Sequence, residues 1–110
     1  MISNLGHFDP ALLPLPPVPE RILTVVANCS GVSISRLLAH RNFERDSFAR
    51  FVAMYLMREM TDLNFRQIGE LLGGRDHSTI FHGCQVIRQR IAASPQFAAV
   101  IGALKVEVGG

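Results

Sequence analysis

From Pro19 to the end of the chain, apolar residues recur at spacings of three and four positions, and no stretch alternates apolar with polar residues. Spacings of three and four place side chains on one face of a helix, whereas strict alternation is typical of a strand. The pattern therefore predicts an all-α fold. A chain of 110 residues, 48% of them apolar, is large enough for one small helical domain with its own core.

The beginning of the chain has a different composition, because five of the six prolines lie at or before Pro19. Proline lacks a backbone N–H and fixes φ, which disfavours both a helix interior and a central strand. We therefore expect two parts, a proline-rich extended arm over residues 1–18 and a helical domain over residues 19–110. The leucines of the arm could contact a partner or fold back on the domain; they are Leu12, Leu13 and Leu15.

Local signals mark where the helices begin and end. Ser33, Asn64 and Asp76 are suited to be N-caps, and Gln67 can complete a capping box with Asn64. Glycines at positions 31, 73 and 74 are suited to helix ends. The polar stretch 40–46 is predicted to be a loop. Helices are expected over residues 19–30, 34–39, 47–61, 65–72, 77–93 and 96–106.

Residues 64–91 have the order helix, glycine turn, helix, which is that of a helix-turn-helix. On the second helix, one narrow apolar stripe is predicted to face the core: Ile80, Cys84, Ile87 and Ile91. The opposite face carries compact hydrogen-bonding side chains rather than a mixture of Glu and Lys: Ser78, His82, Gln85 and Gln89. Such a layout is typical of a recognition helix, whose first residues reach base edges in the major groove.

The charge distribution agrees with a nucleic-acid partner. Ten of the eleven positive charges are arginines within residues 21–90, against six carboxylates, so this block carries +4 while the whole chain carries +2. Arginine suits bidentate contact with phosphate and guanine. Arg75 could contact guanine, Asp76 could accept from cytosine or cap the helix, and Ser78 or Thr79 could contact a thymine methyl. Arg88 and Arg90 flank the helix where phosphates would lie.

Two segments, MYLMREMTDLNFRQ and IGELLGGRDHSTIFHGCQVI, closely resemble the C-terminal DNA-binding domain of the bacterial replication initiator DnaA. The resemblance spans about residues 21–91, and GGRDHST is its most specific part. It implies a helical, Trp-repressor-like fold and binding to the short asymmetric DnaA box in duplex DNA. It also implies that Arg50 contacts a phosphate and that five consecutive positions read bases: Arg75, Asp76, His77, Ser78 and Thr79.

The chain also departs from that family. The loop keeps Arg41 but has Asn42 where the family's minor-groove arginine usually stands, and Glu44 and Asp46 add negative charge that phosphate should repel. Gln85 and Val86 replace the usual basic pair after the helix cysteine. Each lost phosphate contact should lower affinity and flatten its salt dependence. The candidate DNA-binding residues are Arg41, Asn42, Arg50, Arg75, Asp76, His77, Ser78, Thr79, His82 and Gln85.

These observations predict sequence-specific binding of double-stranded DNA at DnaA-box-like sites, which would modulate replication initiation or transcription. No GxxxxGK[ST] motif is present, so ATPase activity is not expected, and a stand-alone relative is favoured over a piece of a longer protein. The alternative is a protein-interaction module that keeps the fold and acts on replication initiation proteins. The sequence fixes neither the oligomeric state nor the preferred site.

Other classes of function are disfavoured. Asp76, His77, Ser78 and His82 lie within seven positions of one helix and cannot surround a common reaction centre, so no catalytic role is expected. His77, His82 and Cys84 lack metal-ligand spacing, and no cofactor is expected. No apolar run approaches the roughly 18 residues of a membrane span. Cys29 and Cys84 form no CxxC motif, which favours a reduced, cytoplasmic setting, and the expected DNA binding adds a nucleoid-associated location.

Overall fold

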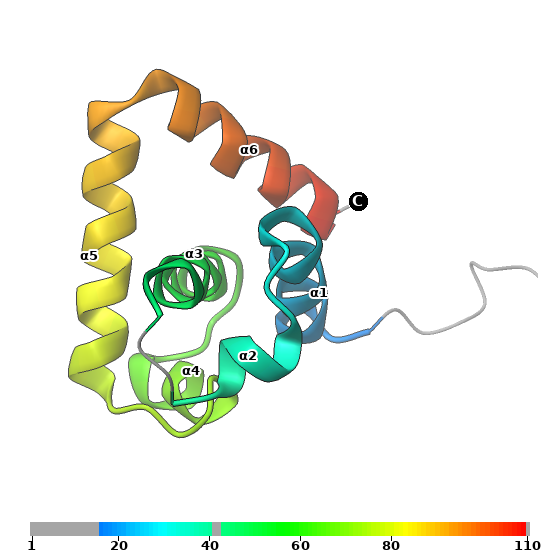
Figure 1. The fold of residues 1–110 in the computed structure, drawn as a ribbon, viewed down its shortest axis with the longest axis vertical. Coiled ribbons are helices and arrows are strands. Elements are labelled where there is room, and N and C mark those ends of the chain that lie inside the picture. Colours follow the sequence, from blue (N-terminus) through cyan, green and yellow to red (C-terminus); the bar gives the residue numbers. More distant parts are fainter. Residues whose placement is uncertain (1–15, 41–42, 110) are drawn as a thin grey trace, which may run out of the picture.

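The computed structural model describes residues 16–40 and 43–109, and these residues form six α-helices and no strand (Figure 1). The all-α prediction is therefore confirmed. Most of the predicted arm, residues 1–15, lies outside the described residues, and the first helix begins one position earlier than expected. The helices are α1 (Val18–Ser30), α2 (Ile34–Leu38), α3 (Glu44–Met60), α4 (Phe65–Leu71), α5 (His77–Ala93) and α6 (Pro95–Gly109).

Helix α3 lies at the centre of the molecule, with α5 and α1 on opposite sides of it and α6 spanning between them (Figure 1). Its middle residues, Ala53, Met54, Leu56 and Met57, have no exposed surface. The Met-rich and aromatic stripe of this segment is thus core, as its spacing predicts.

Helix α5 approaches α3 closely because residue 83 is glycine. A Cβ at Gly83 would overlap the sulfur of Met54 and the ring of Phe51. Ile80, Cys84 and Ile87 are buried on the same side of α5, and Ile91 is half-buried, so the predicted apolar stripe faces the core. This close packing holds α5 in place relative to the rest of the domain.

The predicted caps are confirmed. The Ser33 hydroxyl accepts from the Arg36 amide, and Asn64 and Gln67 form the capping box. Gly31 ends α1 at φ 75°, a left-handed conformation that favours glycine. These ends depend on hydrogen bonds between residues a few positions apart, which is why the sequence identifies them.

The prediction of a loop through residue 46 is wrong at its end, because α3 begins at Glu44 with Phe43 as its N-cap residue. Glu44 and Asp46 occupy the first turn, where carboxylates interact favourably with the helix dipole. Asp46 is also fully buried and paired with Arg36 of α2, a contact that local spacing does not reveal.

Candidate nucleic-acid interface

The turn between α4 and α5 is built around Gly69. Its carbonyl accepts from the amides of Gly74 and Arg75, both at 2.9 Å. A Cβ at Gly69 would overlap the carbonyl of Arg75, and Gly73 and Gly74 have φ of 85° and 78°. The sharp turn therefore requires glycine at these positions, and it fixes the direction in which α5 leaves α4.

The first turn of α5 presents polar side chains at the surface. The Asp76 carboxylate accepts from the Thr79 amide at 2.9 Å and from the Ser78 hydroxyl at 3.0 Å. These hydrogen bonds, with that of the Thr79 hydroxyl, lower the pKa of Asp76 below its ordinary value. Asp76, His77 and Ser78 are all exposed. Asp76 is thus the N-cap, and the tip of α5 is rigid and accessible.

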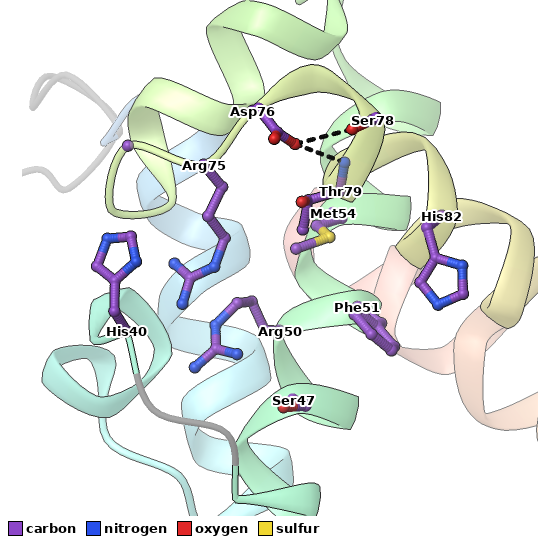
Figure 2. Close-up of a pocket in the computed structure, with 11 residues that line it drawn as sticks. His40, Ser47, Arg50, Phe51, Met54, Arg75, Asp76, Ser78, Thr79 and His82 are labelled. Carbon is purple, nitrogen blue, oxygen red and sulfur yellow. Dashed lines mark hydrogen bonds between the residues drawn. The ribbon is translucent and has the colours of Figure 1, made fainter.

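A pocket of about 670 Å³ lies between α3 and the start of α5 (Figure 2). It brings together six of the predicted site residues: Arg50, Arg75, Asp76, Ser78, Thr79 and His82. The other five lining residues are Gly74 of the turn and four that were not predicted as site residues: His40, Ser47, Phe51 and Met54. Ser47, Arg50, Phe51 and Met54 follow the spacing i, i+3, i+4 and i+7, and this shared helix face is the signal that could have found them.

Arg75 points into this pocket, toward Arg50 and away from the tip of α5 (Figure 2). Its guanidinium donates to the carbonyls of Leu72 and Ala39. Burial and the nearby charge of Arg50 lower the pKa of Arg75, in that order. An arginine pKa starts so high that the side chain stays charged near neutral pH.

Arg50 is the more enclosed of the two arginines, with 3% of its surface exposed. Its Nε donates to the Leu37 carbonyl at 2.8 Å, and its Nη2 donates to the carbonyls of Arg36 and Ala39 at 3.2 and 3.1 Å. Burial lowers its pKa, and the charge of Asp46 opposes this effect. The structure thus gives Arg50 internal partners, while the phosphate contact implied by the resemblance stays a prediction.

Of the other described candidates, His82 belongs to the pocket lining and Gln85 lies beyond it. His82 is exposed and meets the Phe51 ring edge-on, with 5.7 Å between ring centroids. Gln85 is half-buried and accepts from Arg88 at 3.0 Å, one turn beyond His82 and outside the pocket lining. Arg41 and Asn42 lie outside the described residues, so their predicted minor-groove roles stay predictions.

The expectation that Asp46 repels phosphate needs correction. Its carboxylate has no exposed surface and accepts from Arg36 Nη2 at 2.6 Å and Nε at 3.2 Å. The positive charge of Arg36 at 2.6 Å largely cancels this negative charge at the longer distances from which a phosphate would approach. Glu44 is exposed, so its negative charge does remain at the surface.

Two kinds of feature are absent from the described residues, a metal-binding cluster and a membrane-spanning helix. Over residues 16–40 and 43–109, no three His, Cys, Asp or Glu side chains are grouped as they would be around a metal ion. In the same ranges, no helix has the length and apolar character needed to cross a membrane.

The all-α fold, the glycine turn and the exposed polar first turn of α5 define the class of helix-turn-helix DNA-binding domains. Residues 19–87 match the family model described as "Bacterial dnaA protein helix-turn-helix", and the chain belongs to this family. The resemblance found in the sequence is confirmed, and the matched domain is a DNA-binding domain rather than a catalytic one.

Relatives named "Chromosomal replication initiator protein DnaA" support this assignment. The protein from Picosynechococcus sp. is 37% identical over 91% of this chain and 22% of its own length. Those from Treponema denticola and Nostoc sp. are 40% and 45% identical over 78% and 66% of this chain, and 18% and 16% of their own lengths. The chain therefore spans about a fifth of the length of these relatives.

A solved structure described as that of a DNA replication initiation factor has the same fold. It superposes with a TM-score of 0.71 at 23% identity, over 83% of this chain and 29% of that chain.

Proposed function

We propose that the domain binds double-stranded DNA sequence-specifically at DnaA-box-like sites and thereby modulates replication initiation or transcription, without ATPase activity of its own. The observation that carries the proposal is the exposed polar first turn of α5, held rigid by the Asp76 cap, within a helix-turn-helix of this family. The membership in the DnaA family and the DnaA relatives support the same function. A cytoplasmic, nucleoid-associated location is part of the proposal.

In the proposed complex, the N-terminal end of α5 enters the major groove, and Asp76, His77, Ser78 and Thr79 contact base edges. Arg75 would join them by exchanging the Leu72 carbonyl for a guanine while keeping the Ala39 carbonyl. Arg41 and Asn42, between α2 and α3, would lie at the adjacent minor groove.

Fluorescence anisotropy with a labelled duplex carrying a DnaA box, compared with a scrambled duplex, tests the proposal. The affinity should be higher for the box, and log K should fall with log salt by about 0.9 for each phosphate contacted. A selectivity that persists across the salt series supports base reading. Equal affinity for both duplexes would refute it.

His77 offers the sharpest variant, because its side chain is exposed and makes only the smallest of the contributions that shift the pKa of Asp76. His77→Ala should weaken binding to the box by about 1–3 kcal/mol and leave binding to the scrambled duplex unchanged. Gln96→Ala is the control, since residue 96 is exposed on α6, outside the helix-turn-helix.

One observation favours the second candidate, a protein-interaction module acting on replication initiation proteins. Many arginines of this domain have intramolecular partners in addition to Arg50 and Arg75. Arg36 pairs with Asp46, Arg88 lies 3.8 Å from Glu59, and Arg58 and Arg90 lie over phenylalanine rings. Weak binding that is indifferent to DNA sequence would select this candidate.

A further inference from the structure

Helix α2 is only five residues long, so most of its backbone carbonyls accept no hydrogen bond from an amide of the same helix. Its C-terminal end, residues 36–39, leads directly into the segment 40–43 between α2 and α3. The Arg36 carbonyl accepts from the Ala39 amide at 3.3 Å, and partners from elsewhere in the fold can satisfy the others and hold this end of the helix in place.

Arg50 of α3 supplies three of the hydrogen bonds, to the carbonyls of Arg36, Leu37 and Ala39. The planar guanidinium group of arginine can donate to several acceptors at once, and the single ammonium group of a lysine at the same position cannot make the same set of hydrogen bonds. The positive charge also lies at a helix C-terminus, where the helix dipole favours it.

The turn of the helix-turn-helix is tied to the same end of α2. Arg75 donates to the Ala39 carbonyl, so this one oxygen accepts from both arginines. His40 Nε2 lies 2.5 Å from the Gly73 carbonyl oxygen, which accepts a hydrogen bond from it. Gly73 is packed against the Leu38 carbonyl so closely that a Cβ would overlap it. The end of α2 and the turn before α5 are therefore held as one unit.

We infer that Arg50 is a positioning residue for DNA binding: with Arg75 it clamps the end of α2 to the turn, and so sets where the chain enters segment 41–42 relative to α5. This inference rests on the proposed function. Arg50 lines the pocket, but it is 97% buried, and three of its five N–H groups, on Nε and Nη2, already donate to carbonyls rather than to a ligand. In this proposal Arg50 sets the spacing between two DNA-contacting elements, segment 41–42 and the start of α5.

Hydrogen exchange of the DNA-free protein tests the clamp directly. Arg50→Lys keeps the charge but not the planar guanidinium group, and should speed exchange of the α2 amides roughly tenfold, the effect of losing one hydrogen bond to a charged donor. Amides of α6 should not change. Arg45→Lys is the matched control, because Arg45 is an exposed residue of the same helix. Unchanged α2 exchange in Arg50→Lys would overturn the clamp whatever the DNA result.

Binding to the DnaA-box duplex then separates positioning from phosphate contact. The clamp predicts that Arg50→Lys loses roughly tenfold in affinity while keeping the wild-type salt slope. A phosphate contact predicts that Arg50→Lys binds almost normally and that Arg50→Met flattens the slope by about 0.9. If the wild-type protein shows no selectivity, the proposed function fails, and the exchange result still decides whether the clamp exists.

A melting curve shows whether Arg50→Lys folds. If it does not, Arg75→Lys takes its place in the exchange experiment, because Arg75 is more accessible and holds the same Ala39 carbonyl. Faster exchange confined to α2 supports the clamp, and wild-type exchange there overturns it.

Discussion

At the scale of single residues, Asp76 combines a structural role with a position at the surface. Its carboxylate holds the first turn of α5 through the Thr79 amide and the Ser78 hydroxyl, yet it remains exposed. The proposed base-reading residues therefore depend on Asp76 for their geometry.

Asp76→Ala should lower Tm by roughly 5 °C at neutral pH, because the cap of α5 is lost. The pKa of Asp76 is lowered in the folded state, so its stabilisation is present above the ordinary value of 3.8 and is lost as pH falls through the folded pKa. The difference in Tm between the wild-type protein and Asp76→Ala should therefore disappear below about pH 4. Asp76→Asn keeps a side-chain oxygen that can accept from the Thr79 amide, so it should lower Tm by less. A difference in Tm between wild type and Asp76→Ala that grows in acid would contradict this account.

Local spacing predicts the caps but not the internal hydrogen bonds of the arginines. Asp76 and Thr79 are three positions apart, so the cap follows from local spacing. The Ala39 carbonyl lies 11 positions from Arg50 and 36 from Arg75, and only the tertiary fold brings the three residues together. The pattern therefore identified which residues gather at the site but not what they contact there.

At the scale of elements, α2 is joined to α3 by the Arg36–Asp46 pair, whose two side chains are 42% and 0% exposed. Removing Arg36 leaves a buried carboxylate without its bidentate partner, whereas removing the Asp46 charge leaves an arginine that water can reach. Arg36→Met should therefore destabilise the domain by about 2–3 kcal/mol, and Asp46→Asn by less. Urea denaturation measures both, and equal losses would argue against this asymmetry.

The contact between α5 and α3 depends on Gly83. In Gly83→Ala the new methyl group would overlap Met54 and Phe51, so we expect a loss of about 1–3 kcal/mol in the free energy of unfolding. Gly102→Ala is the control, because a Cβ at that position of α6 meets no atom within 4 Å. There, the helix propensity of alanine should stabilise the domain by about 0.5–1 kcal/mol. Similar effects of the two substitutions would show that packing at Gly83 is looser than described.

At the scale of the whole molecule, α6 is separate from the candidate interface. It spans from α5 to α1 at the opposite end of the molecule from α2 and α4 (Figure 1), and it lies beyond residues 19–87 that match the family. Its buried residues are Ile101, Leu104 and Val108, and Arg21 of α1 donates to the Val108 carbonyl at 3.0 Å. Helix α6 thus completes the core, and the pocket is formed without it.

This separation predicts that stability and DNA selectivity can be changed independently. Leu104→Ala removes a side chain that is 5% exposed and should cost about 2–4 kcal/mol of stability. The ratio of affinities for box and scrambled duplexes, measured below the melting range, should not change. Val106→Ala is the control on the same helix, since Val106 is 72% exposed and its loss should alter neither quantity. A selectivity that falls with Leu104→Ala would mean that α6 helps to hold α5 in its binding position.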